Sequence, residues 1–187
     1  MKNVLLSTRP QWCEEICNEI GKDDNGKPIY EKRIEVRKSK PSEVPFKAFI
    51  YCTNDRKIIL DRSETDKIYL NVNIYRNIPM GLNGKVIGEF ICDKVDTYSF
   101  SYYEAEYRIN HIEQKAMCLN HPELIRYGKG KPLYGWHISD LKIYDKPREL
   151  SEFYTPLKVY KDAQGRRVVG GSHRVKRAPQ SWCYVEG

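Results

Sequence analysis

Charged residues at strand spacing are the first group in this sequence that could carry chemistry. In the stretch 32–41, the apolar Ile34 and Val36 alternate with charged residues, and Glu35 and Arg37 fall on the opposite side of an extended chain. A strand of this kind buries its apolar side and presents its charged side as a fixed array, which suits the binding of an anion. The alternative is a solvated edge strand whose charges discourage aggregation.

The residue types in this array suit the recognition of a nucleobase or a phosphate. Arg37 offers a planar fork of hydrogen-bond donors, and Glu35 can accept a hydrogen bond from an exocyclic amine. Lys32 and Lys38 extend the array at its two ends. Lys32 and Glu35 could instead form an acid and base pair for a reaction, or Glu35 and Arg37 could pair only with each other as a structural ion pair. The sequence leaves these alternatives open.

Aromatic side chains could add stacking to this recognition. The chain has 14 Tyr, 5 Phe and 3 Trp, and bases of single-stranded RNA commonly stack on such rings. Packing in the core is the alternative role for each of them. If the fold brings the rings to one opening, the expected nucleic-acid-binding residues are Lys32, Glu35, Arg37, Lys38, Trp12, Tyr51 and Trp182.

The overall charge favours a polyanionic partner. Lys and Arg number 32 against 25 Asp and Glu, which gives a formal charge of +7. A basic C-terminal extension is expected from about 155 to 187, and Gly165 and Gly170 within it predict a mobile loop. The expected partner is therefore RNA or a nucleotide. The basic residues of the extension, with one histidine among them, are Lys158, Lys161, Arg166, Arg167, His173, Arg174, Lys176 and Arg177.

Length, cysteine usage and hydropathy bound the class of protein. A chain of 187 residues with 40% hydrophobic content can fold as a single domain over 1–187. Its six scattered cysteines suit reduced thiols in a cytosolic core. Cys13 and Cys17 share a helix face, but a structural zinc site needs two further ligands, so neither a metal nor another cofactor is expected. The longest apolar run is too short to cross a membrane, and a cytoplasmic protein is expected.

Short elements are expected to position these residues. A strand at 4–7 leads to a helix that begins at Pro10, after a Ser7 or Thr8 cap, and runs to about Ile20. Short strands separated by turns, with helices confined to the start and the middle, favour an α+β barrel over a doubly wound sheet. Further strands are predicted at 46–53, 68–75, 85–95, 133–138, 141–144 and 178–185, with helical segments between 97 and 128.

Four segments, taken in order, carry a resemblance to a known family. They read Leu-Leu-Ser-x-x-Pro-x-Trp at 5–12, Lys-x-x-Glu-Val-Arg-Lys at 32–38, Pro-Phe-Lys-x-Phe-Ile-Tyr-Cys-Thr at 45–53 and Gly-Lys-Val-Ile-Gly-Glu-Phe at 84–90. Together they resemble the ASCH domain family of the PUA-like superfamily, over most of the chain to about residue 153. The resemblance implies a PUA-like β-barrel with flanking helices. It also implies a cleft beside the Glu-x-Arg strand, suited to RNA or a modified nucleoside.

Some members of that family are enzymes, either amidohydrolases acting on acetylated cytidine or ribonucleases. In the amidohydrolases the strand reads Lys-x-x-Thr-x-Arg, and a glutamate follows in the later helical region. Lys32 and Arg37 match, whereas Glu35 replaces the threonine and Lys115 stands where the later glutamate is expected. The resemblance therefore implies a nucleic-acid-binding module, with a hydrolase using Lys32 and Glu35 as the alternative. An accessory protein-binding module is a third possibility, which would show a contiguous apolar surface patch.

Overall fold

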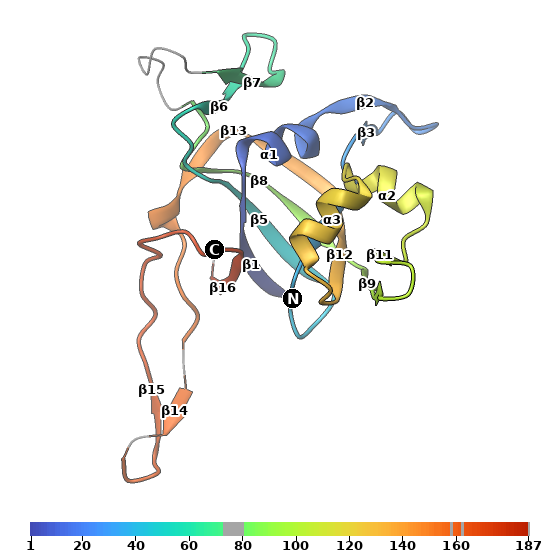
Figure 1. Cartoon of the computed structure of the whole chain (residues 1–187). Coiled ribbons are helices and arrows are strands. Elements are labelled where there is room, and N and C mark those ends of the chain that lie inside the picture. Colours follow the sequence, from blue (N-terminus) through green and yellow to red (C-terminus); the bar gives the residue numbers. More distant parts are fainter. Residues whose placement is uncertain (73–80, 158, 162, 187) are drawn as a thin grey trace.

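The computed structural model describes residues 1–72, 81–157, 159–161 and 163–186, and Figure 1 shows their arrangement. Lys158 and the last three residues of the strand predicted at 68–75 lie outside the described residues. The helices are α1 (Pro10–Cys17), α2 (His111–Met117) and α3 (His121–Gly128), with a 3-10 turn at Leu150–Glu152. The strands are β1 (Lys2–Thr8), β2 (Glu19–Lys22), β3 (Pro28–Tyr30), β4 (Ile34–Arg37), β5 (Phe46–Cys52), β6 (Ile58–Arg62), β7 (Ile68–Val72), β8 (Lys85–Cys92), β9 (Val95–Tyr98), β10 (Phe100–Ser101), β11 (Glu106–Tyr107), β12 (Leu133–His137), β13 (Ser139–Glu149), β14 (Val159–Lys161), β15 (Arg167–Val169) and β16 (Trp182–Val185).

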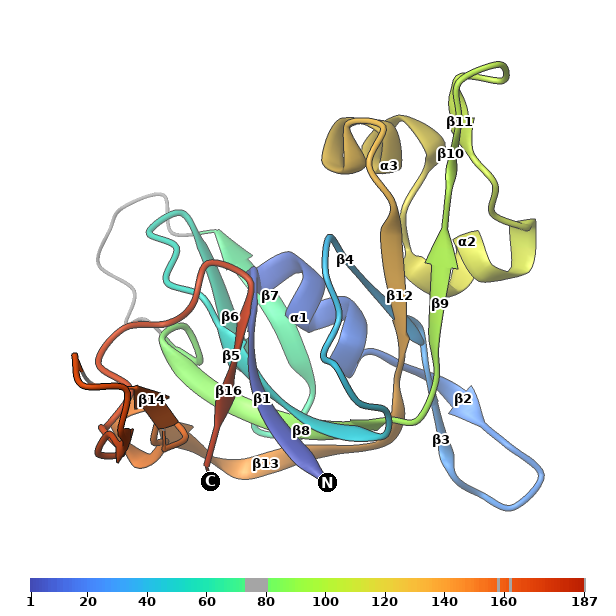
Figure 2. The same cartoon turned by 90° about the horizontal axis from the view of Figure 1, so that it is seen from below.

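The largest sheet has five strands in the order β13-β8-β5-β1-β16. β1 runs parallel to β5, and the other neighbours are antiparallel. One face of this sheet packs against α1, where Cys13 and Ile16 join Leu6 and Ile50 in the main core (Figure 2). Leu5 packs in a separate cluster on the opposite face. Because both faces are covered, the middle of β1 (residues 4–6) and most of β5 are runs of apolar residues.

A second sheet, in the order β4-β12-β9, lies beside the first (Figure 2). On one of its faces, Ile34 and Val36 pack in a cluster with Leu124 of α3. On its other face, Trp136 is buried in the main core with its ring edge-on to Phe46 at 4.9 Å between centroids. The charged residues that alternate with Ile34 and Val36 on β4 therefore face the space toward the first sheet.

The expected mixed class of fold is confirmed, since helices accompany a chain made mostly of strands. The described strands pair as an open five-stranded sheet with β13 and β16 at its edges, a three-stranded sheet and four two-stranded ribbons. This pairing among the described residues is not one closed ring of strands, so the barrel stays a prediction.

The predicted extension of the first helix to Ile20 is wrong. The helix ends at Cys17 because Asn18 has extended backbone (φ −74°, ψ 106°), and the chain then enters β2, where Ile20 is 59% exposed. Arg9 is the residue that precedes the helix, while Thr8 still belongs to β1. The chain therefore passes directly from a buried strand into the helix.

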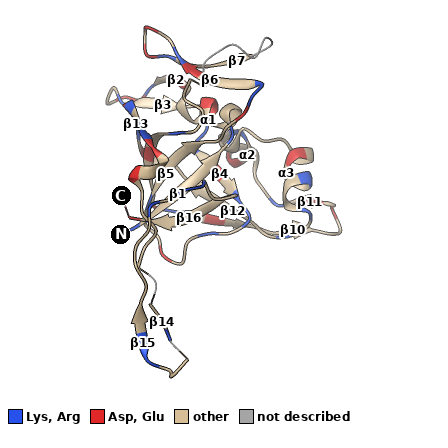
Figure 3. Cartoon of the chain, turned by 90° about the vertical axis from the view of Figure 1, so that its left-hand side faces the viewer, with Lys and Arg blue, Asp and Glu red and all other residues tan. Residues whose placement is uncertain are grey.

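The chain beyond the 3-10 turn leaves the two sheets and then returns. β14 and β15 pair as a hairpin that projects from the rest of the molecule, and each strand carries a basic residue, Lys161 and Arg167 (Figure 3). Gly165 has φ 77° between these strands, a conformation that glycine adopts readily. The final residues pair as β16 with β1, so the basic extension ends as part of the main sheet.

Candidate functional site

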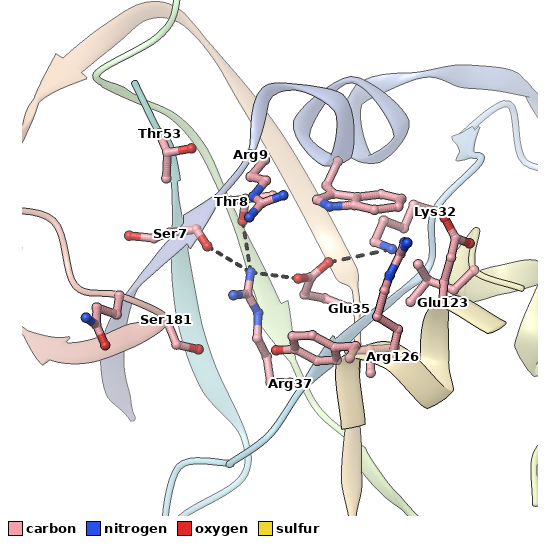
Figure 4. A pocket seen from close by; sticks show the side chains of 15 residues that line it. Ser7, Thr8, Arg9, Lys32, Glu35, Arg37, Thr53, Glu123, Arg126 and Ser181 are labelled. Atoms are coloured by element: carbon pink, nitrogen blue, oxygen red, sulfur yellow. Dashed lines mark hydrogen bonds and ion pairs between the residues drawn. The ribbon is translucent and has the colours of Figure 1, made fainter. Parts of the chain in front are cut away.

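A cavity of about 480 Å³ opens where the end of β1, the start of α1, β4 and α3 meet (Figure 4). Three of the charged residues predicted from the stretch around β4, namely Lys32, Glu35 and Arg37, lie together on its wall. The other polar side chains that line it come from distant parts of the chain: Ser7, Thr8, Arg9, Thr53, Glu123, Arg126, Tyr127, Gln180 and Ser181.

Arg37 is fixed in this wall by contacts with two strands. Its Nη2 donates hydrogen bonds to the backbone carbonyl of Ser7 at 3.0 Å and to Oγ1 of Thr8 at 3.2 Å. The same nitrogen lies 2.7 Å from Oε1 of Glu35. The side chain is buried, with the residue 7% exposed. These contacts hold the guanidinium plane in one orientation, so its remaining donors are organised before any ligand arrives.

Lys32 lies at the inner end of the same wall. The residue is 1% exposed, and its ammonium donates to the backbone carbonyl of Met117. Its Nζ is 3.7 Å from Oε2 of Glu35 and 5.1 Å from the centre of the Trp12 ring. An ammonium, a carboxylate and a guanidinium thus form a row (Figure 4), in which each charge offsets part of the cost of burying its neighbour.

Two atoms of this row have no hydrogen-bond partner among the described residues. They are Oε2 of Glu35 and Nε of Arg37, and both are buried. The distance of 3.7 Å from Oε2 to Nζ of Lys32 is an ion-pair contact and too long for a good hydrogen bond. Because buried polar atoms are nearly always hydrogen-bonded, one acceptor and one donor on the same wall suit a ligand that presents both kinds of group. The edges of nucleobases do so.

The outer lining of the cavity adds positive charge. Arg9 and Arg126 are exposed and come from opposite sides, one before α1 and the other on α3. The whole lining contains four basic side chains and two carboxylates, those of Glu35 and Glu123. The opening therefore favours an anionic group, and two guanidinium forks match the geometry of a phosphate.

The burial of β4 distinguishes the two expectations for its charged side, a fixed array and a solvated edge strand. All four residues of β4 are buried, because α3 covers one side and β1 supplies the partners of Arg37 on the other. The solvated edge strand, which was the alternative, is wrong for the same reason. The predicted alternation is correct, and its charged side lines the cavity.

The structure separates the remaining candidate residues into two groups. Trp12 lines the cavity. Tyr51 is buried in the cluster on the far face of the main sheet, and Trp182 packs against the main core outside the cavity lining. Lys38 is exposed just beyond Arg37, with its Nζ 4.8 Å from the ring centre of Tyr127. The positions of Tyr51 and Trp182 give no support to stacking inside this cavity.

Sequence reasoning misses the contributions of β1 and α3. Thr8 is considered there only as a helix cap and Arg9 is not considered, although both line the cavity. The side chains of Glu123, Arg126 and Tyr127 come from a helix whose capping box and apolar side are those of any surface helix. Their spacing of three and four residues places them on one face of α3, and that was the available signal.

The part of the chain that the structure describes contains no cluster of three or more His, Cys, Asp or Glu side chains suited to a metal, and the six cysteines are free thiols. In the same part of the chain, none of the helices has the length and apolar character to span a membrane.

Glu15 of α1 lies close to this row and has an unusual carboxyl. Its Oε2 is buried without a hydrogen-bond partner among the described residues. Burial raises the pKa of the carboxyl from 4.5 to about 7, although the Lys32 ammonium acts in the opposite direction. Between pH 4.5 and about 7, this carboxyl is therefore mostly protonated in the folded protein and mostly ionised in the unfolded chain. Since the folded state binds more protons, the free energy of unfolding falls as the pH rises through this range.

We expect Glu15→Gln to remove this pH dependence. At about pH 8 the variant should unfold with a free energy higher than that of the wild type by about 1 to 2 kcal/mol, a value reduced for partial exposure, and near pH 4 the two should agree. Urea denaturation at several pH values measures the difference. The control is Glu19→Gln, at an exposed glutamate. A plot of its free energy of unfolding against pH should stay parallel to that of the wild type. Identical slopes for Glu15→Gln and wild type between the two pH values would contradict the assignment.

Two solved structures are similar to this chain in fold. ASCH from Zymomonas mobilis superposes with a TM-score of 0.53 at 14% sequence identity, covering 99% of this chain and 88% of that chain. A serine-to-alanine variant of that protein gives a TM-score of 0.52 at 13% identity, with coverage of 99% and 89%. No protein-family model matches the sequence, and no curated protein matches it. The chain therefore has the fold of the ASCH domain, as the resemblance of its four segments implied.

Proposed function

We propose that this protein binds RNA or a nucleotide in the cavity beside β4. The observation that carries the proposal is the pair of buried atoms without hydrogen-bond partners among the described residues, Oε2 of Glu35 and Nε of Arg37, on one cavity wall. A concave site with a few converging polar groups is the usual form of a small-molecule site, and about 480 Å³ lies in the volume range of such sites.

Each group of the wall has a distinct part in this proposal. Oε2 of Glu35 accepts a hydrogen bond from a base amine or ring N–H, and Nε of Arg37 donates to an adjacent acceptor of the same base. The Trp12 ring, which already faces a cation, flanks the base. Arg9 and Arg126 bind the phosphate at the opening. Lys32 holds the Glu35 carboxylate in position through their ion pair.

The proposal includes three further expectations: a PUA-like barrel in a single domain, a cytoplasmic setting, and a contribution to binding from the basic residues near the C-terminus. The two sheets, with the cavity between β1 and β4, would act together as the wall of a PUA-like barrel in a single domain. The six cysteines are free, which supports a cytoplasmic setting for the protein, where thiols stay reduced. The basic residues near the C-terminus, including Arg167 on the projecting hairpin (Figure 3), add attraction for a polyanion.

Arg37→Lys tests the proposal with little change in charge. Lysine keeps the positive charge but removes the Nε donor and the planar fork, so we expect the affinity for a short single-stranded RNA to fall by about 10- to 100-fold. Fluorescence anisotropy with labelled RNA measures it. The matched control is Arg33→Lys, since Arg33 is exposed and does not line this cavity.

The wild-type protein should also lose affinity steeply as salt is added, because the phosphate contacts release counterions. Affinity that is equal in the two Arg variants, or that does not change with salt, would contradict binding in this cavity.

A hydrolase acting on a modified nucleoside or on RNA is a second candidate, favoured by one observation. Oγ1 of Thr8 lies on the cavity wall, 3.2 Å from Nη2 of Arg37. A hydroxyl is thus present beside Arg37, in the cavity that Lys32 and Glu35 also line, although β4 itself carries Glu35 in place of the threonine of the related amidohydrolases. Acid and base roles for Lys32 and Glu35 would complete the site. The test is turnover of acetylated cytidine and of short RNA by the wild type, Lys32→Met and Thr8→Val. Ligand binding without turnover by the wild type would exclude this candidate.

A further inference from the structure

Two segments of chain lead out of the cavity side by side. Arg37 on the cavity wall is followed by the exposed Lys38. Ser181, also on the wall, accepts a hydrogen bond from the backbone N–H of Ser7 at 2.8 Å and is followed by Trp182. Outside the cavity the two segments remain in contact, because Nε1 of Trp182 donates to Oγ of Ser39 at 3.0 Å. A continuous surface therefore begins at the cavity wall.

Lysines cover aromatic rings along this surface. Nζ of Lys38 lies 4.8 Å from the ring centre of Tyr127, which itself lines the cavity. Nζ of Lys40 lies 5.6 Å from the ring centre of Tyr134, on the strand that pairs with β4. Each ring thus has a cation above its face.

The surface continues along β16. Trp182 and Tyr184 lie 5.3 Å apart between centroids, edge to face, and both are partly exposed. Nζ of Lys2 lies 5.3 Å from the ring centre of Tyr184. The same ammonium pairs with Glu43 at 2.7 Å, so a carboxylate marks the end of the basic surface. We name the whole set the lysine–aromatic track: Lys38, Lys40, Tyr127, Tyr134, Trp182, Tyr184 and Lys2.

We propose that the lysine–aromatic track binds the nucleotides that flank the one held in the cavity, when the ligand is a single strand of nucleic acid. This inference rests on the proposed function. Single strands are bound where aromatic faces alternate with cations, because bases stack on the rings and the cations meet the phosphates. A base that stacks on Tyr134 would displace the ammonium of Lys40 from the ring face, and the freed ammonium would then lie beside the backbone. The track also gives Trp182 and Lys38, which lie outside the cavity lining, a role in binding.

The test compares a single nucleotide with a short strand. The probes are uridine monophosphate, penta-uridylate and penta-thymidylate, titrated into the wild type and into the double variant Lys38→Ala, Lys40→Ala. Both lysines are exposed, so the variant should fold. We expect the pentanucleotides to bind about tenfold or more tighter than the mononucleotide to the wild type, since they also occupy the track. The double variant should lose about tenfold for both pentanucleotides and nothing for the mononucleotide, and its salt slope should decrease by about 1.4 for two lost phosphate contacts.

The matched control is Lys22→Ala, Lys146→Ala, two exposed lysines on β2 and β13. This control should keep the pentanucleotide affinities. Pentanucleotides that bind no tighter than the mononucleotide, or an equal loss in both double variants, would overturn the track while leaving the cavity site intact. Loss of mononucleotide binding in the Lys38, Lys40 variant would also overturn it. A different result would contradict the cavity site and support the track. In that result the mononucleotide does not bind the wild type, while the pentanucleotides bind it and their binding depends on Lys38 and Lys40.

Discussion

Glu35→Ala should lower the free energy of unfolding by about 3 to 5 kcal/mol. The carboxylate contacts Arg37 at 2.7 Å and Lys32 at 3.7 Å, and these residues are 7% and 1% exposed. Removing it leaves two buried cations without their shared counter-charge. Removing one partner of a buried ion pair lowers stability far more than replacing both partners with apolar residues, because the remaining charge stays buried without its partner.

Urea denaturation of the purified variant measures this change. The control is Glu43→Ala, which removes the partner of Lys2 in a surface pair at 2.7 Å, and it should cost less than about 1 kcal/mol. Glu35→Gln should fall between the two, since the amide can still accept a hydrogen bond from Arg37. If Glu35→Ala were as mild as Glu43→Ala, Lys32 and Arg37 would not depend on Glu35 as their shared counter-charge, and the description of a buried, mutually stabilised row of charges would be incorrect.

Trp136→Ala should have an effect of similar size, about 3 to 5 kcal/mol. The side chain is fully buried between the two sheets, 4.9 Å from Phe46 and 5.7 Å from Trp182 between ring centroids. Its removal leaves a large cavity at the place where β12 meets the main core. Because β12 pairs with β4, the loss should also loosen the wall that holds Glu35.

Thermal and urea unfolding of Trp136→Ala would measure the loss, with Tyr103→Ala as the control. Tyr103 is 99% exposed, and its removal should change stability by no more than about 0.5 kcal/mol. Two separate unfolding transitions in the wild type, with only one of them shifted by Trp136→Ala, would show that the sheets do not share one core.

The pattern of the β4 stretch was sufficient to predict a strand, its apolar side and the charged residues that share a wall. It was not sufficient to predict the burial of Glu35 and Arg37. Those charges are enclosed by Ser7 and Thr8 on β1 and by α3, segments that lie far away in the sequence. Local alternation reports which side chains share a face, whereas the tertiary structure decides what covers that face.

The aromatic candidates show the same limit. Trp12 lines the cavity because it lies in the first turn of a helix that starts beside it. Tyr51 faces the other side of the main sheet, since it lies one residue along β5 from Ile50, which faces α1. A shift of one residue in a strand changes the face, and the sequence did not show which face of β5 would meet the cavity.

The most direct test of the cavity is a crystal structure of the protein grown with each common ribonucleoside monophosphate in turn. The account predicts a base in the cavity, with a donor within about 3.2 Å of Oε2 of Glu35 and an acceptor within the same distance of Nε of Arg37. It also predicts the phosphate near Arg9 or Arg126. A nucleotide bound elsewhere on the surface, with both atoms of the row still unpartnered by it, would contradict the central claim.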